Sequence, residues 1–468
     1  MLSTPQNYSI YPSIIPADRQ TDMIIAPNER AFVFEDGEKY ELTVISVNAD
    51  EPSYHIPTTH KKFSAEAKDG VLRFSYTFES EQEHIIILNK DEKVIQEFHV
   101  FSLYEDLYAL TALKGDLHGH SCRSDGKRDP AALAGYYREQ GFDFFALTDH
   151  NRYHFGGEID EVYDGVNTGL VRIFGEEVHP VGSVLHIVHV CGNSSVSDLY
   201  VHDLEGFEKD IEEYKANVPA NIPEKYKSRY AKAMWTVDRI HETGGLAIYP
   251  HPYWRPGRSR IYHACDEFAM LMLKSGMFDA FELVGGMEQD GINRAVALWA
   301  DLRVEGLNIP VVGSSDVHEV NGKTFNNCFT VCFAKSNSRE DIRDALTEGK
   351  CVAVEATGEE SEREYRPYGS LRLVTYAQFL LKYYFPKRQR ICQGAGVTMR
   401  AYSMGEASKE LLELETKLSE DFTLRFFGKK EPKLPNAEML VFENKWREVH
   451  ANGPSGKGSV IFKDYKME

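Results

Sequence analysis

Hydrophobic and polar residues are arranged in three different ways along the chain. Up to about residue 112, short apolar runs of β type recur between turn-rich pieces such as Glu-Asp-Gly-Glu. From about residue 113, strand-like apolar runs alternate with segments of helical spacing, and this continues to about residue 356. Beyond that point a charged stretch leads into helix-like segments. We therefore predict three domains, 1–112, 113–356 and 357–468.

The first domain is predicted to be a small antiparallel β-sandwich. Several short strands at regular spacing, with turn signals between them, are typical of such a domain. Its histidines, His55, His60, His84 and His99, are interpreted as non-catalytic. The predicted strands cover residues 30–34, 40–47, 71–78, 84–89 and 94–103.

The central domain is predicted to be α/β, because repeated strand–helix units form a parallel sheet or barrel. One helix is expected over residues 129–140, with Asp129 as its N-cap and Pro130 in its first turn. Further helices are expected over residues 231–242 and 293–304. In an α/β barrel the carboxyl ends of the strands meet at one mouth, so residues far apart in sequence can form one site. A charged helical insertion, residues 194–230, is expected to cover that mouth or simply to be solvated.

Polar clusters stand where these predicted strands end. Positions i and i+2 of an extended segment point to the same side, so His118 and His120 can face one ion, and so can Asp316 and His318. Imidazole combined with carboxylate suits zinc, manganese or iron better than calcium. The clusters are Asp-Leu-His-Gly-His at 116–120 followed by Ser-Asp-Gly at 124–126, Thr-Asp-His at 148–150, Gly-Glu-Glu at 175–177, His186, His251 and Ser-Asp-Val-His at 315–318.

The composition of the chain limits the kinds of metal site and partner that we expect. The 7 cysteines are scattered, none forms a ligand-like pair near the polar clusters, and Cys328 and Cys332 are expected in a strand core. The formal net charge of -19 disfavours nucleic acid as a partner, although bound divalent ions would make a pocket locally positive. The sequence has no apolar run of about 18 residues and no signal-peptide pattern, so we expect a cytoplasmic protein without a membrane span.

These motifs, in this order, resemble the polymerase-and-histidinol-phosphatase (PHP) superfamily of metal-dependent phosphoesterases over about residues 113–356. The resemblance implies a distorted (β/α)7 TIM-like barrel that holds two or three divalent metal ions. Asp-Leu-His-x-His, followed by Ser-Asp-Gly and Thr-Asp-His-Asn, is most similar to stand-alone phosphoesterases and to carbamate hydrolases of the carbaryl-hydrolase type. A β-sandwich ahead of the barrel is similar to the second group. The mixed, partly helical C-terminal extension is expected to pack on the barrel or to contact another subunit.

The resemblance also implies a set of metal ligands. Glu177 would bridge two metals, although the sequence leaves its neighbour Glu176 as an alternative. Asp125 stands where some members of the superfamily carry His, which would change the preferred metal or the occupancy of the third position. The implied ligands are His118, His120, Glu177 and Asp316 for the first metal, Glu177, His186 and His251 for the second, and Asp125, His150 and His318 for the third.

Catalysis is expected to use water activated between divalent ions of zinc, manganese or iron. Neither a Gly-x-Ser-x-Gly elbow nor a P-loop points to a covalent nucleophile. His318 and Asp149 are the candidate catalytic side chains, Asp149 either as a proton carrier or as an orienting partner. His154, His179 and His263 are candidates for lining the pocket, whereas His189 is expected to be structural.

Substrate recognition is predicted for Arg255, Arg258 and Arg260, which follow His251 on a loop at the mouth. Arginine forks match phosphate oxygens, which favours a phosphomonoester or phosphodiester as substrate. The alternative for these arginines is pairing with acidic surface groups. Two other functions stay open, hydrolysis of carbamates, carboxyl esters or amides at the same metal centre, and a non-catalytic binding module. The expected partner is a small-molecule ester, and assembly into a homo-oligomer is left open.

Overall fold

The computed structural model describes residues 6–48, 60–154, 157–257, 259–358 and 362–451, and its internal contacts divide it into two compact units. One unit comprises the described residues of 105–423. The other comprises those of 6–104 together with those of 424–451. The division into three domains stays a prediction, because contacts alone do not show which parts of a chain fold separately.

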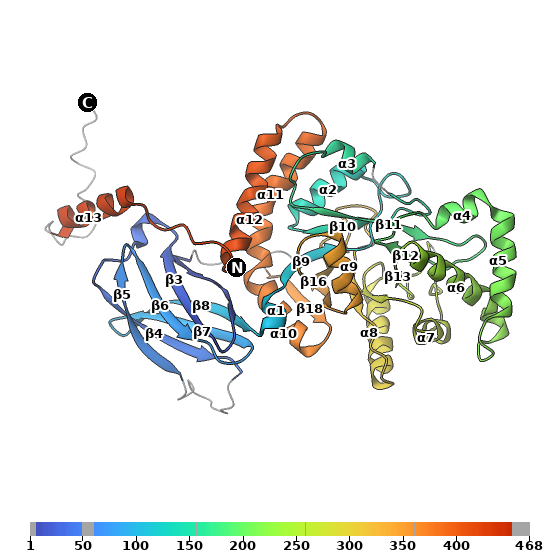
Figure 1. Cartoon of the computed structure of the whole chain (residues 1–468), viewed down its shortest axis with the longest axis horizontal. Helices are drawn as coiled ribbons and strands as arrows, with labels where there is room; N and C mark the ends of the chain where they lie inside the picture. Colours follow the sequence, from blue (N-terminus) through green and yellow to red (C-terminus); the bar gives the residue numbers. More distant parts are fainter. Residues whose placement is uncertain (1–5, 49–59, 155–156, 258, 359–361, 452–468) are drawn as a thin grey trace. The chain divides into compact units, whose positions relative to one another are not determined.

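The unit that begins the chain is built from eight strands in one continuous sheet, ordered β1-β3-β6-β5-β4-β7-β8-β2 (Figure 1). Neighbouring strands are antiparallel, except that β2 runs parallel to β8. Alternate residues of β7 are buried, as expected for a strand with one face on a core. The region is all-β as predicted, but its strands join one hydrogen-bonded sheet, so the two sheets of a sandwich are not established. The strands are β1 Tyr8–Tyr11, β2 Ile14–Pro16, β3 Gln20–Pro27, β4 Lys39–Ser46, β5 Lys61–Lys68, β6 Val71–Thr77, β7 Gln82–Lys90 and β8 Lys93–Leu103, and the unit also holds η1 Arg30–Phe32 and α13 Ala437–Ala451.

The prediction of a strand over residues 30–34 is wrong. Arg30–Phe32 forms a short 3-10 helix instead. Phe34 is buried there, stacked on Tyr8 with 4.5 Å between the ring centroids. Four strands, β1, β2, β3 and β5, were not anticipated. In β5 only two alanines are fully buried, so its hydrophobic alternation is too weak to read from sequence.

The unit of residues 105–423 is built on a ten-stranded sheet, ordered β15-β14-β13-β12-β11-β10-β9-β16-β17-β18. The sheet curls until β15 reaches β16, where Thr330 Oγ1 accepts from Gly313 N at 3.1 Å and donates to Gly313 O at 2.8 Å. The result is a mixed α/β near-barrel. The regular (β/α)7 alternation is not confirmed, because β12 and β16 run antiparallel to both of their neighbours. The strands are β9 Thr111–Asp116, β10 Phe144–Leu147, β11 Val171–Val178, β12 Ile187–Val190, β13 Leu246–Tyr249, β14 Ala280–Val284, β15 Val311–Gly313, β16 Cys328–Ala334, β17 Cys351–Thr357 and β18 Glu364–Tyr368.

Helices connect these strands largely where helical spacing was predicted. The first long one, α2, begins at Pro130, and the Asp129 side chain caps it by accepting from Ala132 N at 2.9 Å. Two helices of the predicted insertion, α4 and α5, pack on α6, and Phe207 meets Trp235 edge-on at 4.9 Å between ring centroids. The helices are α1 Glu105–Tyr108, α2 Pro130–Glu139, α3 Glu158–Val162, α4 Ser197–His202, α5 Leu204–Ala216, η2 Glu224–Tyr226, α6 Lys227–Glu242, α7 Asp266–Lys274, α8 Gln289–Val304 and α9 Arg339–Thr347.

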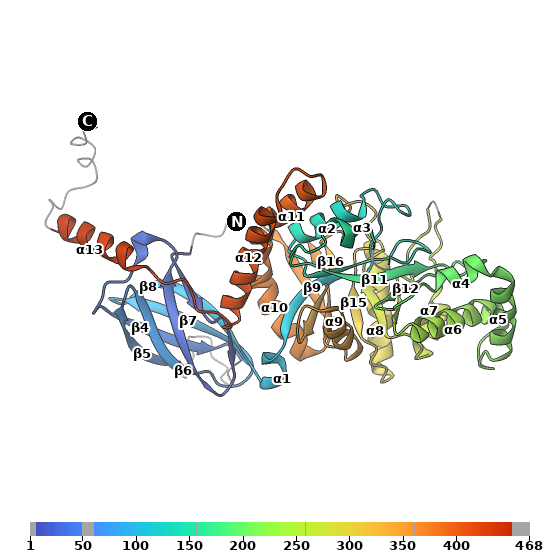
Figure 2. The ribbon, with the colours of Figure 1, turned by 45° about the horizontal axis from the view of Figure 1, so that its top comes forward.

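The C-terminal helices α10 Leu371–Tyr383, α11 Phe385–Ser403 and α12 Lys409–Phe426 follow β18. Helix α11 lies along α2, as two views show (Figures 1 and 2). A Cβ on Gly396 would lie 2.3 Å from the backbone nitrogen of Glu139, so only glycine permits this approach. The buried pair of Arg388 and Asp143, 2.5 Å apart, joins α11 to the loop after α2.

Among the described residues, no helix combines the length and apolar character needed to cross a membrane.

Candidate metal centre

The curled sheet brings all nine predicted metal ligands to one place. They follow the ends of β9, β10, β13 and β15, lie within β11, or immediately precede β12. The parallel pairing of β10 with β11 continues as a bridge between His150 and Glu177, which sets these two residues side by side. Within each of five groups, the ligand atoms lie within 4.8 Å of one another. The groups are His120 with Asp125, His150 and His318; His118 with His251 and Asp316; His118 with His120 and Glu177; Glu177 with His186 and His251; and His150 with Glu177 and His179.

Glu177 stands at the centre of these groups and is only 1% exposed. Its Oε1 lies 2.8 Å from His186 Nδ1 and 3.2 Å from His251 Nε2. Its Oε2 lies 2.8 Å from His150 Nδ1 and 3.4 Å from His118 Nε2. One carboxylate with imidazoles on both oxygens has the arrangement that a bridging ligand between two cations requires.

The sequence left open which of the two adjacent glutamates faces the cluster. Glu176 points to the other side of β11, where it accepts from Val196 N at 2.6 Å and contacts His189 Nδ1 at 3.2 Å. Successive residues of a strand point to opposite faces, so only one of the pair can reach the cluster. The structure brings Glu177 into the cluster, and His189 lies on the opposite side with Glu176.

Several buried polar atoms of the cluster have no hydrogen-bond partner within the part of the chain that the structure describes. A buried polar atom left unpaired costs about 1–3 kcal/mol, and a bound cation would satisfy nitrogen and oxygen lone pairs that converge in this way. The donor set therefore fits divalent metal ions. The atoms without a hydrogen bond among the described residues include His118 Nε2, His120 Nδ1, His150 Nδ1, His186 Nδ1 and Glu177 Oε2.

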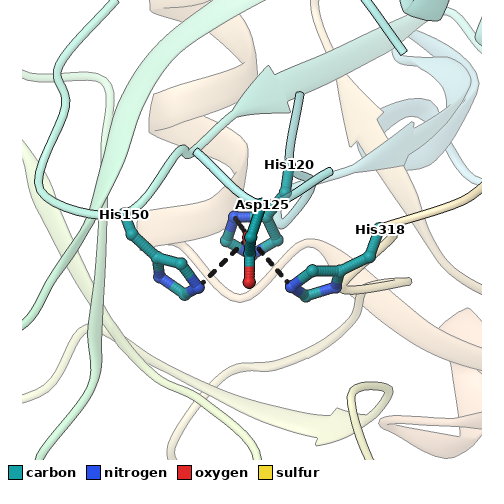
Figure 3. A group of neighbouring side chains, drawn as sticks. All are labelled: His120, Asp125, His150 and His318. Atoms are coloured by element: carbon teal, nitrogen blue, oxygen red, sulfur yellow. Dashed lines mark ion pairs between the residues drawn. The ribbon is translucent and has the colours of Figure 1, made fainter. Parts of the chain in front are cut away.

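At the outer rim of the cluster, three imidazoles surround one carboxylate (Figure 3). Asp125 Oδ1 lies 3.3 Å from His318 Nε2, 3.4 Å from His150 Nε2 and 4.0 Å from His120 Nδ1. The side chains of Asp125 and His318 are 55% and 40% exposed. This group is thus the part of the cluster most open to solvent.

Neighbouring groups fix which ring nitrogen of a histidine faces the cluster. His318 Nδ1 donates to the Asp316 carbonyl at 2.9 Å, which leaves the Nε2 lone pair for a metal. His118 Nδ1 contacts the buried carboxylate of Glu282 at 2.9 Å, with the same consequence. Glu282 was not singled out from the sequence. The available signal was a lone acidic residue inside the apolar strand Ala-Phe-Glu-Leu-Val.

Asp116 and Asp149 hold the loops that carry the ligands. Asp116 accepts from Ser315 N at 3.0 Å and from Tyr137 Oη at 3.0 Å, and burial raises its pKa to about 6. Asp149 accepts from Ser121 N at 2.7 Å and from His154 Nε2 at 2.6 Å. Burial alone would raise the pKa of Asp149, but these hydrogen bonds keep it below its ordinary value.

The candidate catalytic residue Asp149 is therefore engaged by Ser121 and His154 and belongs to none of the donor groups. Its position is that of an orienting partner, one of the two roles predicted for it. The other catalytic candidate, His318, lies inside the rim group with Asp125. Participation of either residue in the reaction stays a prediction.

The backbone is strained where two ligands leave their strands. His251 and Asp316 have φ values of 22° and 51°, in a region that costs non-glycine residues roughly 1–3 kcal/mol. The turn after β14 makes room for them, because a Cβ on Gly286 would lie 2.9 Å from Asp316 Oδ2 and 3.1 Å from His251 Cβ. Such strain is typical of functional sites, where the surrounding structure enforces it.

The electrostatics of the cluster couple cation binding to protons. Burial alone would lower the pKa of His118, but the carboxylates of Asp316, Glu177 and Glu282 raise it well above its ordinary value. Burial would raise the pKa of Glu177, and His118 and His186 hold it well below. Metals bind deprotonated ligands, so cations must displace these protons, and metal affinity falls as the pH decreases.

The three histidines predicted to line the pocket have different surroundings. His154 is bound to Asp149, as described above. His263 packs edge-on against His186 at 4.7 Å between ring centroids, and burial lowers its pKa to about 2. His179 enters a donor group with His150 and Glu177.

For the arginines predicted to bind substrate, the structure shows the surroundings of Arg255 and Arg260. The Arg255 guanidinium lies 3.0 Å from Glu288 and also pairs with Asp290, so its charge is already compensated. Arg258 lies outside the described residues, and Arg260 is exposed. Arg255 lines a groove of about 920 Å³ together with Trp254, Asp316 and Lys323. Trp254 and Asp316 also line the metal pocket, so the groove opens beside it.

Comparison with known proteins gives weak structural likenesses only. No family model matches the sequence, and no curated protein matches it. A two-domain protein from Bacteroides vulgatus, described as containing a PHP-like metal-dependent phosphoesterase, matches with 19% identity and a TM-score of 0.35, over 52% of this chain and 65% of that one. The chain thus spans less than two thirds of that protein.

Two further solved structures are similar over about half of the chain. A protein from Bifidobacterium adolescentis, described as a metal-dependent phosphoesterase, has 17% identity and a TM-score of 0.32, over 45% of this chain and 89% of that one. An amidohydrolase from Chromobacterium violaceum, with bound sulfate and no metal, has 20% identity and a TM-score of 0.28, over 44% of this chain and 87% of that one. The Bacteroides and Bifidobacterium proteins are described as metal-dependent phosphoesterases, the class of protein that the sequence motifs resemble. All three TM-scores are too low to support a functional conclusion, so the donor cluster has to support it.

Proposed function

We propose that this chain is a metal-dependent hydrolase of the PHP type that cleaves a phosphate ester. The observation that carries the proposal is the buried carboxylate of Glu177. Imidazole nitrogens of six histidines lie within 3.5 Å of its oxygens, and several of the buried donor atoms have no hydrogen bond among the described residues. Uncompensated donors of this kind are costly unless cations bind them. The order of the motifs along the sequence supports the PHP type.

Divalent ions of zinc, manganese or iron, when bound, would polarise the ester and lower the pKa of the attacking water towards about 7. The contribution of the chain is to hold these ions in a fixed arrangement and to keep each imidazole in the tautomer that presents a lone pair. Asp125 and His318 lie at the open rim, so substrate would approach from their side. The proposed positions are His118, His120, Glu177 and Asp316; Glu177, His186 and His251; and Asp125, His150 and His318.

The groove beside the metal pocket would receive the rest of the substrate. Trp254 supplies an aromatic wall, and Lys323 is the cation of the groove lining that could attract a phosphate. Arg255, predicted to fork onto phosphate, is held by Glu288 and Asp290. This observation favours a second candidate, the hydrolysis of a neutral carbamate, carboxyl ester or amide at the same centre.

A panel of substrates tests the proposal. Protein loaded with manganese or zinc is assayed with p-nitrophenyl phosphate, bis-p-nitrophenyl phosphate, p-nitrophenyl acetate and a naphthyl carbamate. We expect hydrolysis of at least one phosphate substrate, and a loss of more than about 100-fold in kcat/KM for Asp316→Asn, which removes a charged metal ligand. Hydrolysis of the acetate and carbamate alone would replace the phosphoesterase by the second candidate.

The variant Arg372→Met serves as a matched control for the assay. Arg372 pairs with Asp106 on the exposed surface of the same unit, remote in sequence from every donor group. Its activity should equal that of the wild type. If Asp316→Asn kept wild-type activity at full metal loading, the metal centre would not be the site of hydrolysis.

A further inference from the structure

His179 lies outside the nine metal ligands that the family resemblance implies, yet it faces the same cluster. It follows β11 two positions after Glu177, and residues i and i+2 of an extended segment point to the same side. Its Nε2 lies 3.4 Å from Glu177 Oε2. Its ring stacks on His186 at 3.7 Å between centroids and lies 4.3 Å from the ring of His150.

The inner nitrogen of His179 is near Glu177 but makes no hydrogen bond with it. Nε2 is buried without a hydrogen bond among the described residues, while the side chain as a whole is 24% exposed. The main chain is fixed, because His179 N donates to Asn151 Oδ1 at 2.8 Å, and Asn151 in turn accepts from Tyr200 Oη at 2.6 Å. A lone pair held in place and aimed at a carboxylate oxygen is the arrangement of a ligand.

His150 presents its two nitrogens to two different donor groups. Nε2 lies 3.4 Å from Asp125 Oδ1, and Nδ1 lies 2.8 Å from Glu177 Oε2. A neutral imidazole has one lone pair, so His150 can serve only one of these groups at a time. His179 supplies the additional nitrogen that the group around Glu177 Oε2 needs to hold an ion by itself.

The geometry points to a further cation position, and we propose that His179 is a metal ligand there together with His150 and Glu177. Two His and one Glu form a known catalytic zinc donor set, with nitrogen and oxygen about 2.0–2.2 Å from the ion. Two ligands at that distance in a tetrahedral site are about 3.4 Å apart, which is the spacing of His179 Nε2 and Glu177 Oε2. The inference rests on the proposed metal centre. Because His150 can serve only one donor group at a time, this position is an alternative to the third one that the family resemblance implies.

Replacing His179 by Ala tests the position through metal binding rather than activity. Titration of the full chain with zinc, in competition with a chromophoric chelator, should show one ion whose dissociation constant rises by more than about 10-fold, while the others keep their affinity. The control is His241→Ala, because His241 pairs with Asp279 outside every donor group. Its zinc titration should equal that of the wild type.

A second variant reports coordination directly. The thiolate of His179→Cys should give the cobalt(II)-loaded protein a near-ultraviolet charge-transfer band that is absent from the wild type and from His241→Cys. Unchanged zinc affinities in His179→Ala, with no band in His179→Cys, would overturn the assignment even if the wild type binds metal and hydrolyses substrate. A wild type that binds no metal would instead contradict the proposed function itself.

Discussion

The contact between His118 and Glu282 determines which face of one imidazole the metal centre can use. Both side chains are fully buried, and Nδ1 and Oε2 are 2.9 Å apart. The carboxylate holds the Nδ1 proton and thereby turns the Nε2 lone pair towards Glu177 and Asp316. Among the described residues Glu282 is a member of no donor group, so its contribution would be to position a ligand.

We expect Glu282→Gln to weaken metal binding by about 10-fold to 100-fold, because a neutral amide holds the Nδ1 proton less strongly than a carboxylate does. The measurement is zinc affinity by chelator competition. The thermal unfolding temperature of the metal-free variant should stay within a few degrees of the wild type, which separates a positioning role from a structural one.

Glu176→Gln is the matched control, since Glu176 forms a similar buried pair with His189 on the opposite face of β11. It should leave zinc affinity unchanged. Equal losses in the two variants would mean that the substitution acts through general packing rather than through His118.

At the scale of elements, α11 is joined to the near-barrel by a buried ion pair. Arg388 and Asp143 are 5% and 7% exposed, and Arg388 also donates to the carbonyl of Gly141 at 2.5 Å. Burial would lower the pKa of Arg388, but Asp143 raises it, so the pair remains charged. The pair therefore resists separation of α11 from the loop that leads into β10.

Arg388→Met is expected to destabilise the protein by about 3–5 kcal/mol, because it leaves the Asp143 carboxylate buried without its partner. Arg372→Met removes an exposed pair with Asp106 in the same unit and should cost at most about 1 kcal/mol. Urea denaturation of the two variants, followed by circular dichroism, measures the difference. A similar small effect for both would show that solvent reaches Asp143.

At the scale of the whole molecule, all donor groups found among the described residues lie in the unit of residues 105–423. Metal binding should therefore stabilise this unit and not the unit of residues 6–104 and 424–451. The cluster joins six separate segments, so cations would cross-link loops that are far apart in the sequence.

Removal of metal by a chelator should increase hydrogen exchange in peptides that contain β9, β11 and β13. Peptides that contain β7 and β8 should exchange at an unchanged rate, and added zinc should restore the original pattern. Mass spectrometry of deuterated peptides measures both units in one sample. Equal changes in the two units would contradict a site confined to one of them. Lower pH should act like the chelator, because protons compete for the imidazoles.

The ligand-bearing segments and the α/β character of the region around them were predictable from local patterns in the sequence. Each ligand lies in a strand, beside one or on the loop that follows one, and the apolar runs of these strands are readable without a structure. Asp129 caps α2 where the N-cap pattern predicted it. Local patterns of this kind depend on neighbouring residues only. The same local reasoning failed at residues 30–34, where an apolar run of strand type contains a short 3-10 helix.

Which of these residues come into contact was not predictable from local patterns and depends on the fold. The choice between Glu176 and Glu177, the pairing of His118 with Glu282, and the entry of His179 into the cluster depend on the register of strands that are distant in the sequence. The commitment of Arg255 to Glu288 and Asp290 likewise depends on a helix that begins more than 30 residues later. Residue type fixes what a side chain can bind, but the fold fixes its partners. Contacts form only between residues that the curled sheet brings close together.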